Sequence, residues 1–168
     1  WYAEREGKAM IHFGATVSHG RIRMGALSGT SDPIRDNASK EQMATMLARV
    51  EEGLDQGALG IGYGIQYTPG ATRDEIWKMF ELATRKKVTN FVHVRFAGQI
   101  EPGSSIEAIQ EMIANASSTG GSVHVVHIGS SGLGQVPILL KMIENAQKSG
   151  IDVSTEIYPY TAASTSIN

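Results

Sequence analysis

Short apolar segments alternate strictly with longer amphipathic ones, and no other feature of this sequence constrains its fold as much. Strand-like segments are predicted at residues 10–17, 58–63, 90–94, 122–128 and 151–157. Apolar residues recur at helical spacing in residues 40–56, 72–87, 104–118 and 133–149. This alternation indicates an α/β fold in which parallel strands are joined by crossover helices.

Capping residues mark the expected helix ends. Ser39 and Thr72 stand where side-chain oxygens accept hydrogen bonds from the first helical turn, and Gly57 follows the first of these helices as a C′ glycine would. Residues 20–37, polar and containing Pro33, are expected to form an extended loop.

Parallel strands in this number permit two architectures, an open doubly wound sheet or part of a (β/α)8 barrel. A complete barrel needs ~250 residues, and the chain has 168. No linker or low-complexity tract divides residues 1–168, so we expect a single domain. In both architectures the functional residues lie at the carboxyl ends of the strands.

Composition restricts the chemistry. The chain has no cysteine, so a metal site within it must use histidine, carboxylate or water. A formal net charge of -2 gives no reason to expect nucleic acid or an anionic membrane as partner. No stretch approaches the ~20 apolar residues of a membrane span, and no signal peptide is visible, so a cytoplasmic location is predicted. The chain starts at Trp1 rather than Met, and we expect that both ends are cut from a longer protein.

His93 and His127 are the candidate metal ligands. They come at the ends of two consecutive predicted strands, one β/α unit apart, and should therefore stand side by side at the barrel mouth. Two imidazoles suit zinc or another divalent metal. The alternative is that each is a buried polar residue bonded to backbone. His124 forms an HxxH with His127, but residues three apart on a strand face opposite ways, so His124 is predicted to point toward the helices.

Four further residues are candidate substrate contacts. His19 ends the first predicted strand and could contact substrate or support the loop that follows. Arg95 could pair with a substrate carboxylate, or form a surface ion pair. Tyr67 and Tyr158 follow two other strands, where a tyrosine can bind ligand or simply pack. Residues 129–132 are predicted to be a flexible rim.

Four segments in a fixed order resemble the D-aminoacylase (N-acyl-D-amino-acid deacylase) branch of the amidohydrolase superfamily. They are GALGIGYGIQYTPG, FVHVR, VVHIGSSG and DVSTEIYPYTAAST. Relatives that act on general D-amino acids often carry lysine at the position of Gly129. With glycine there, the segment HIGSS is more similar to that of the N-acyl-D-glutamate deacylases.

The resemblance implies a partial (β/α)8 barrel with about five strands and four helices of it, and zinc-dependent hydrolysis of N-acyl-D-amino acids. It implies that His93 and His127 are metal ligands and that Tyr67 and Tyr158 lie near the substrate. No HxH pair and no cysteine is present, and the catalytic Asp of the family is expected beyond residue 168. The chain would then contain no catalytic residue of its own.

Two other functions stay open. One is a cyclic-amide hydrolase of the same superfamily, similar to hydantoinases. The other is that these 168 residues are inert by themselves: an incomplete barrel leaves open strand edges, so the chain is expected to self-associate.

Overall fold

A computed structural model describes residues 2–160 and 162 of the chain. The helices and strands alternate as the sequence predicts. In chain order they are β1 (Val17–Ser18), α1 (His19–Ala26), α2 (Lys40–Asp55), β2 (Gly60–Gly64), the 3₁₀ turn η1 (Ile65–Tyr67), α3 (Arg73–Lys86), β3 (Thr89–His93), α4 (Ser105–Thr119), β4 (Val123–Val125), α5 (Ile128–Gly132), the 3₁₀ turn η2 (Leu133–Gln135), α6 (Val136–Lys148) and β5 (Val153–Thr155).

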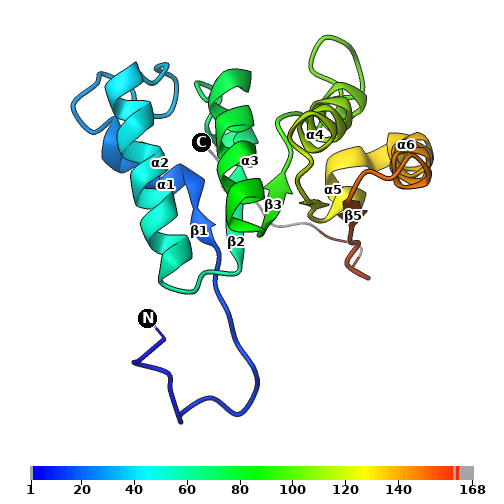
Figure 1. The fold of residues 1–168 in the computed structure, drawn as a ribbon. Helices are drawn as coiled ribbons and strands as arrows, with labels where there is room; N and C mark the ends of the chain where they lie inside the picture. Colours follow the sequence, from blue (N-terminus) through cyan, green and yellow to red (C-terminus); the bar gives the residue numbers. More distant parts are fainter. Residues whose placement is uncertain (1, 161, 163–168) are drawn as a thin grey trace.

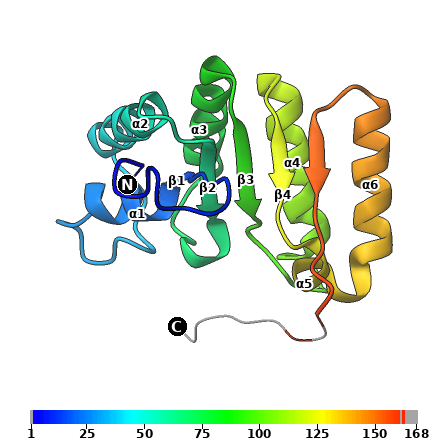
Figure 2. The same ribbon diagram turned by 90° about the horizontal axis from the view of Figure 1, so that it is seen from below.

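The five strands form one parallel sheet in the order β1-β2-β3-β4-β5. Figures 1 and 2 show that α2, α3, α4 and α6 all cover the same face of the curved sheet. Crossover connections are right-handed, so strands that are added to a sheet in sequence order have all their helices on the same face. In a doubly wound sheet the strand order reverses partway, and helices therefore cover both faces. The topology therefore decides between the two predicted architectures in favour of a barrel segment.

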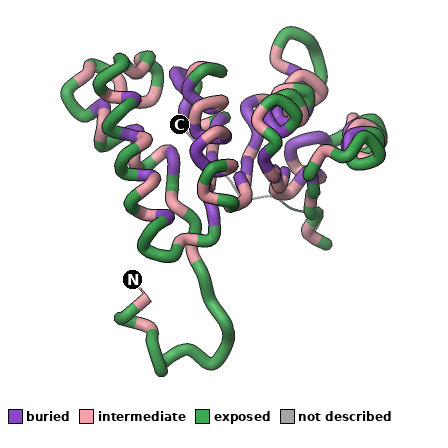
Figure 3. The backbone as a smooth tube through the Cα atoms, viewed as in Figure 1, coloured by how far each residue is buried: buried purple, intermediate pink, exposed green. Residues whose placement is uncertain are grey.

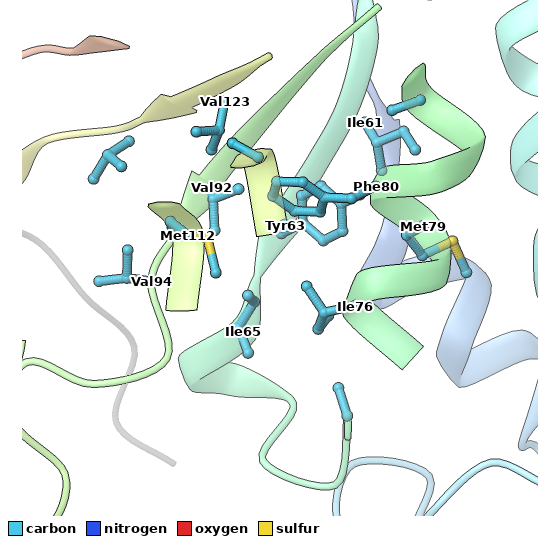
Figure 4. Close-up of a cluster of buried hydrophobic side chains, with 14 of the residues drawn as sticks. Ile61, Tyr63, Ile65, Ile76, Met79, Phe80, Val92, Val94, Met112 and Val123 are labelled. Carbon is cyan, nitrogen blue, oxygen red and sulfur yellow. The ribbon is translucent and has the colours of Figure 1, made fainter. Parts of the chain in front are cut away.

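The core lies between the sheet and these helices. Figure 4 shows Tyr63 and Val92 of the sheet in one cluster with Phe80 and Met79 of α3, and all four are buried. The ring centroids of Tyr63 and Phe80 lie 5.9 Å apart. Figure 3 shows that burial concentrates on the sheet and on the inward faces of the helices. The opposite face of the sheet, which would line the barrel, carries glycine at positions 60, 62 and 64 of β2.

The predicted starts of α2, α3 and α4 are confirmed. Ser39 and Ser104 each form a complete capping box, in which the side-chain oxygens of Gln42 and Glu107 accept a hydrogen bond from the backbone N–H of the cap residue. Thr72 accepts from the backbone N–H of Glu75. These local signals place α2, α3 and α4 within a residue or two of the expected bounds.

The first predicted strand is wrong over most of its length. Only Val17–Ser18 pairs with a neighbour, and Met10 and Ile11 are exposed. Apolar β-prone residues form a strand only where another strand offers a ladder of hydrogen bonds. In the described structure the Ala15 carbonyl accepts from the Leu59 N–H just before β2, but residues 10–16 are not part of the sheet. The loop predicted for residues 20–37 is also wrong at its start, because α1 occupies His19–Ala26 with Ser18 as its N-cap.

The region after β4 differs from prediction as well. The strand ends at Val125 rather than at residue 128, and residues 129–132, predicted to be a flexible rim, belong to the short helix α5 (Ile128–Gly132). The last helix begins at Val136 instead of Leu133. This early exit from the sheet determines where His127 lies.

None of the helices in the described part of the chain is long and apolar enough to cross a membrane.

Candidate metal centre

The two candidate ligands lie at the carboxyl ends of adjacent strands. His93 is the last residue of β3 and pairs in register with Gly64, the last residue of β2. His127 follows β4 after one intervening residue and immediately precedes α5. The parallel sheet thus places both imidazoles at one edge, as their spacing predicts.

The ring nitrogens of the two histidines face each other. His93 Nδ1 lies 2.9 Å from His127 Nε2, and the ring centroids are 4.7 Å apart in an edge-on arrangement. Two nitrogen ligands at ~2.0–2.1 Å from a tetrahedral zinc lie ~3.3 Å from each other. The observed separation is close to that value, so the pair fits two positions of one divalent metal.

Burial and the neighbouring His127 lower the pKa of His93 to about 4. His93 is therefore neutral near pH 7 and has a lone pair on one ring nitrogen. A metal binds only the neutral imidazole, so this environment keeps His93 in the form that a ligand needs.

His127 has a backbone conformation that is rare for a residue with a side chain. Its φ of 40° and ψ of 51° lie in the left-handed region, where strain persists only if the surrounding structure compensates for it. The backbone N–H groups of Ser130 and Ser131 both donate to the His127 carbonyl, and Ser130 Oγ lies 3.2 Å from Nδ1. This turn directs the imidazole toward His93.

The pair borders a cavity of about 520 Å³. Its described lining consists of aromatic rings, uncharged polar side chains and alanines: Gln66, Tyr67, His93, Ala97, His127, Ser130, Ser131, Tyr158, Tyr160 and Ala162. No acidic or basic side chain other than the histidines is among them. Within residues 2–160 and 162, no group of three or more His, Cys, Asp or Glu side chains could hold a metal. The described chain therefore supplies two ligands.

Tyr67 and Tyr158, predicted as substrate contacts, both line the cavity. The Tyr67 ring lies 4.9 Å from the His93 ring. Their role with substrate stays a prediction, although their position is consistent with it. Gln66 lies in the same cavity and was not singled out from the sequence. Its signal is positional, because it comes two residues after Gly64, the last residue of β2.

His19 is fully buried beneath this edge and is absent from the cavity lining. Its Nε2 lies 2.8 Å from Glu75 Oε1, which also accepts from Arg23 Nε at 3.0 Å. Arg23 reaches further, to the carbonyls of Pro33 and Asp36. These contacts join α1, α3 and the intervening loop, so of the two predicted roles the structure favours loop support.

Arg95 is also turned away from the cavity. Its Nε and Nη2 donate to the two carboxylate oxygens of Glu111 at 2.8 Å, and Nη1 donates to the Ala71 carbonyl. The Arg95 side chain is 8% exposed. The ion pair predicted as an alternative thus exists, but it is buried rather than on the surface, and it occupies the planar donor edge that a substrate carboxylate would need.

The predicted orientation of His124 is wrong. His124 pairs in register with Phe91, and Val125 pairs with Val92. Side chains alternate along a strand, so Phe91 and His93 share one face of β3, and His124 lies on that barrel-lining face too. Val92 and Val125 face the helices. It bonds to Ser154 Oγ at 2.8 Å. Strand alternation fails as a guide here because the strand ends at Val125, and the turn alone places His127 beside His93.

A barrel segment with a histidine pair at the mouth of adjacent strands is typical of metal-dependent hydrolases. A curated relative supports that class: the N-acyl-D-glutamate deacylase of Alcaligenes xylosoxydans xylosoxydans is 29% identical over 164 residues, which cover 94% of this chain and 32% of the relative. No protein-family profile matches the chain.

Solved structures agree in fold. N-acyl-D-glutamate deacylase from Bordetella bronchiseptica, complexed with zinc and a phosphonate mimic of the tetrahedral intermediate, has a TM-score of 0.78 at 25% identity, over 95% of this chain and 33% of that one. A D-aminoacylase mutant in complex with CuCl₂ has a TM-score of 0.79, also at 25% identity, over 95% and 33%. L-hydantoinase from Arthrobacter aurescens, at 18% identity, has a TM-score of 0.54 over 68% of this chain and 30% of that one, and shares the fold alone.

The resemblance to the D-aminoacylase branch of the amidohydrolases is therefore confirmed across nearly the whole chain. The chain spans about a third of the length of the relatives it matches.

Proposed function

We propose that this chain forms part of a metal-dependent amide hydrolase that removes the acyl group from N-acyl-D-amino acids. The observation that carries the proposal is the His93–His127 pair, whose facing nitrogens lie 2.9 Å apart at the carboxyl ends of adjacent barrel strands. The similarity to N-acyl-D-glutamate deacylases supports linear amides as the substrate class.

Zinc, or another divalent metal, is the cofactor that suits this donor set. When bound it would lower the pKa of a water molecule and polarise the amide carbonyl. His93 and His127 would hold it, and the lowered pKa of His93 lets that residue bind without first losing a proton near pH 7. The remaining ligands and the Asp that moves the proton to the leaving amine are expected outside this chain.

The cavity residues would bind and orient the substrate. Tyr67 and Tyr158 offer hydroxyl groups and aromatic faces to the cavity that the histidine pair borders. Since the lining contains no Lys or Arg, this part of the chain supplies no charged partner for an acidic substrate. Preference for N-acyl-D-glutamate over other N-acyl-D-amino acids would have to come from groups elsewhere in the intact enzyme.

Release of acetate from N-acetyl-D-amino acids by the intact protein that carries this chain tests the proposal. We expect turnover with zinc, loss of turnover on chelation, and recovery on adding zinc back. N-acetyl-L-glutamate and a hydantoin are the matched control substrates. Activity on the ring amide but not on the linear one would favour the cyclic-amide alternative, and no metal-dependent release from any N-acyl-D-amino acid would contradict the proposal.

The isolated 168 residues are expected to show no turnover and to self-associate. No described strand pairs with the outer edge of β1 or of β5, and such edges offer unpaired N–H and C=O groups to another copy. Sedimentation velocity over a range of concentrations measures this. A sample that stays monomeric and hydrolyses substrate would overturn the expectation.

A further inference from the structure

Gln66 contacts the ring nitrogen of His93 that does not face His127. Its side-chain carbonyl oxygen, Oε1, lies 2.9 Å from His93 Nε2. A carbonyl oxygen only accepts hydrogen bonds, so this contact requires a proton on Nε2. Because a neutral imidazole carries one N–H, the other nitrogen, Nδ1, must then present its lone pair.

His127 also has a hydrogen-bond partner at the ring nitrogen that does not face His93. Its Nδ1 lies 3.2 Å from Ser130 Oγ, and that hydroxyl lies 3.1 Å from the His127 carbonyl oxygen. The Ser130 hydroxyl can therefore donate either to His127 Nδ1 or to the carbonyl. In the metal-free chain, His127 Nε2–H donates to His93 Nδ1 across 2.9 Å, and Ser130 Oγ–H donates to His127 Nδ1. If the His127 proton moves to Nδ1, Ser130 Oγ can accept it while donating to the carbonyl, and both facing nitrogens are then free to bind one metal.

The backbone explains why Gln66 reaches His93. Gly64 pairs with His93 in register, and the chain then turns through η1, so that Gln66 stands just beyond the strand end. Thr68 Oγ1 donates to the Gly64 carbonyl and closes this turn. A Cβ at Gly64 would lie 3.0 Å from the Tyr67 ring, so glycine lets the turn pack closely beside β3.

We propose that Gln66 is a positioning residue that holds His93 in the tautomer with its proton on Nε2, leaving Nδ1 to bind the metal shared with His127. This inference rests on the proposed function for its consequence, although the tautomer itself is a property of the metal-free chain. Outer partners of this kind fix the ring orientation and tautomer of metal-binding histidines, and their loss lowers metal affinity by roughly 10–100-fold.

Nitrogen NMR of the metal-free chain tests the tautomer directly. In the unsubstituted chain, the His93 ring should give a protonated-type ¹⁵N shift at Nε2 and an unprotonated-type shift at Nδ1. Gln66→Leu removes the acceptor at an exposed position, so folding should be unaffected and the two tautomers should mix. Gln66→Glu restores an acceptor and should restore the single tautomer. Gln110→Leu, exposed on α4, is the matched control and should change nothing.

Zinc titration by calorimetry gives the second measurement. Gln66→Leu should weaken zinc binding by roughly 10–100-fold, whereas Gln66→Glu and Gln110→Leu should bind at least as tightly as the unsubstituted chain.

The outcomes separate this inference from the function it rests on. A proton on His93 Nδ1 in the unsubstituted chain, or equal zinc affinity in Gln66→Leu and the unsubstituted chain, would overturn the role of Gln66 while leaving the metal site intact. If the tautomers are as expected but the intact protein that carries this chain binds no zinc, the proposed function is contradicted. The role of Gln66 in fixing the orientation of the His93 ring would still stand.

Discussion

Replacing His127 with glutamine should weaken zinc binding by the isolated chain at least ~100-fold, which is more than the loss of an outer partner causes. His127 supplies one of the two facing nitrogens, and His93 Nδ1 alone would bind a cation no better than a lone imidazole does. Competition between the chain and a zinc chelator of known affinity measures the change.

His124→Gln is the matched control for this variant. His124 stands three residues away on the same β/α unit, but it bonds to Ser154 and lies within 3.5 Å of Glu156 rather than at the mouth. Zinc affinity should be unchanged by this substitution. If His124→Gln weakens binding as strongly as His127→Gln, the pair at the strand ends is not the metal site.

The second large effect is expected at the buried cluster under the site. Glu75→Ala should lower the free energy of unfolding by about 3–5 kcal/mol, because it leaves the Arg23 guanidinium buried without its carboxylate. Both side chains are almost completely buried, at 0% and 2% exposure. His19 Nε2 would lose the same partner. Urea denaturation of the variant against the unsubstituted chain measures the loss.

Asp74→Ala, the neighbouring substitution in the first turn of α3, serves as the control. Asp74 is exposed and pairs with Lys78 one turn along, and such surface pairs contribute at most about 1 kcal/mol. The double variant Arg23→Met with Glu75→Leu should lose less than the two single variants together, since no buried charge is then left alone. Equal losses for Asp74→Ala and Glu75→Ala would show that the buried pair contributes nothing special.

Much of the fold could be predicted because its signals are local. Ser39, Thr72 and Ser104 cap their helices through hydrogen bonds within three residues of the chain, so the sequence is enough to locate them. The alternation of strands and helices likewise predicts a parallel sheet. The prediction of one domain over residues 1–168 stays a prediction.

The wrong secondary-structure predictions concern segments whose conformation depends on residues far away in the sequence. Residues 10–16 have strand-like composition, yet the described sheet does not include them, although the Ala15 carbonyl accepts from the Leu59 N–H. Conversely α1 has a weakly amphipathic sequence, and its position depends on Arg23, which is buried through contacts with Glu75 and with the Pro33 and Asp36 carbonyls. Neither outcome can be inferred from nearest neighbours in the sequence, because the partners lie tens of residues away.

The histidine pair likewise has one part that the sequence predicts and one part that depends on tertiary contacts. The sequence by itself determines that His93 and His127 follow consecutive strands, and parallel pairing then brings them to one edge of the sheet. Only the tertiary structure decides which atoms meet there. Strand periodicity ends at Val125, and the left-handed turn at His127, held by the start of α5, aims Nε2 at His93. Gln66 joins them through a turn whose path depends on packing against β3, a contact that no spacing in the sequence encodes.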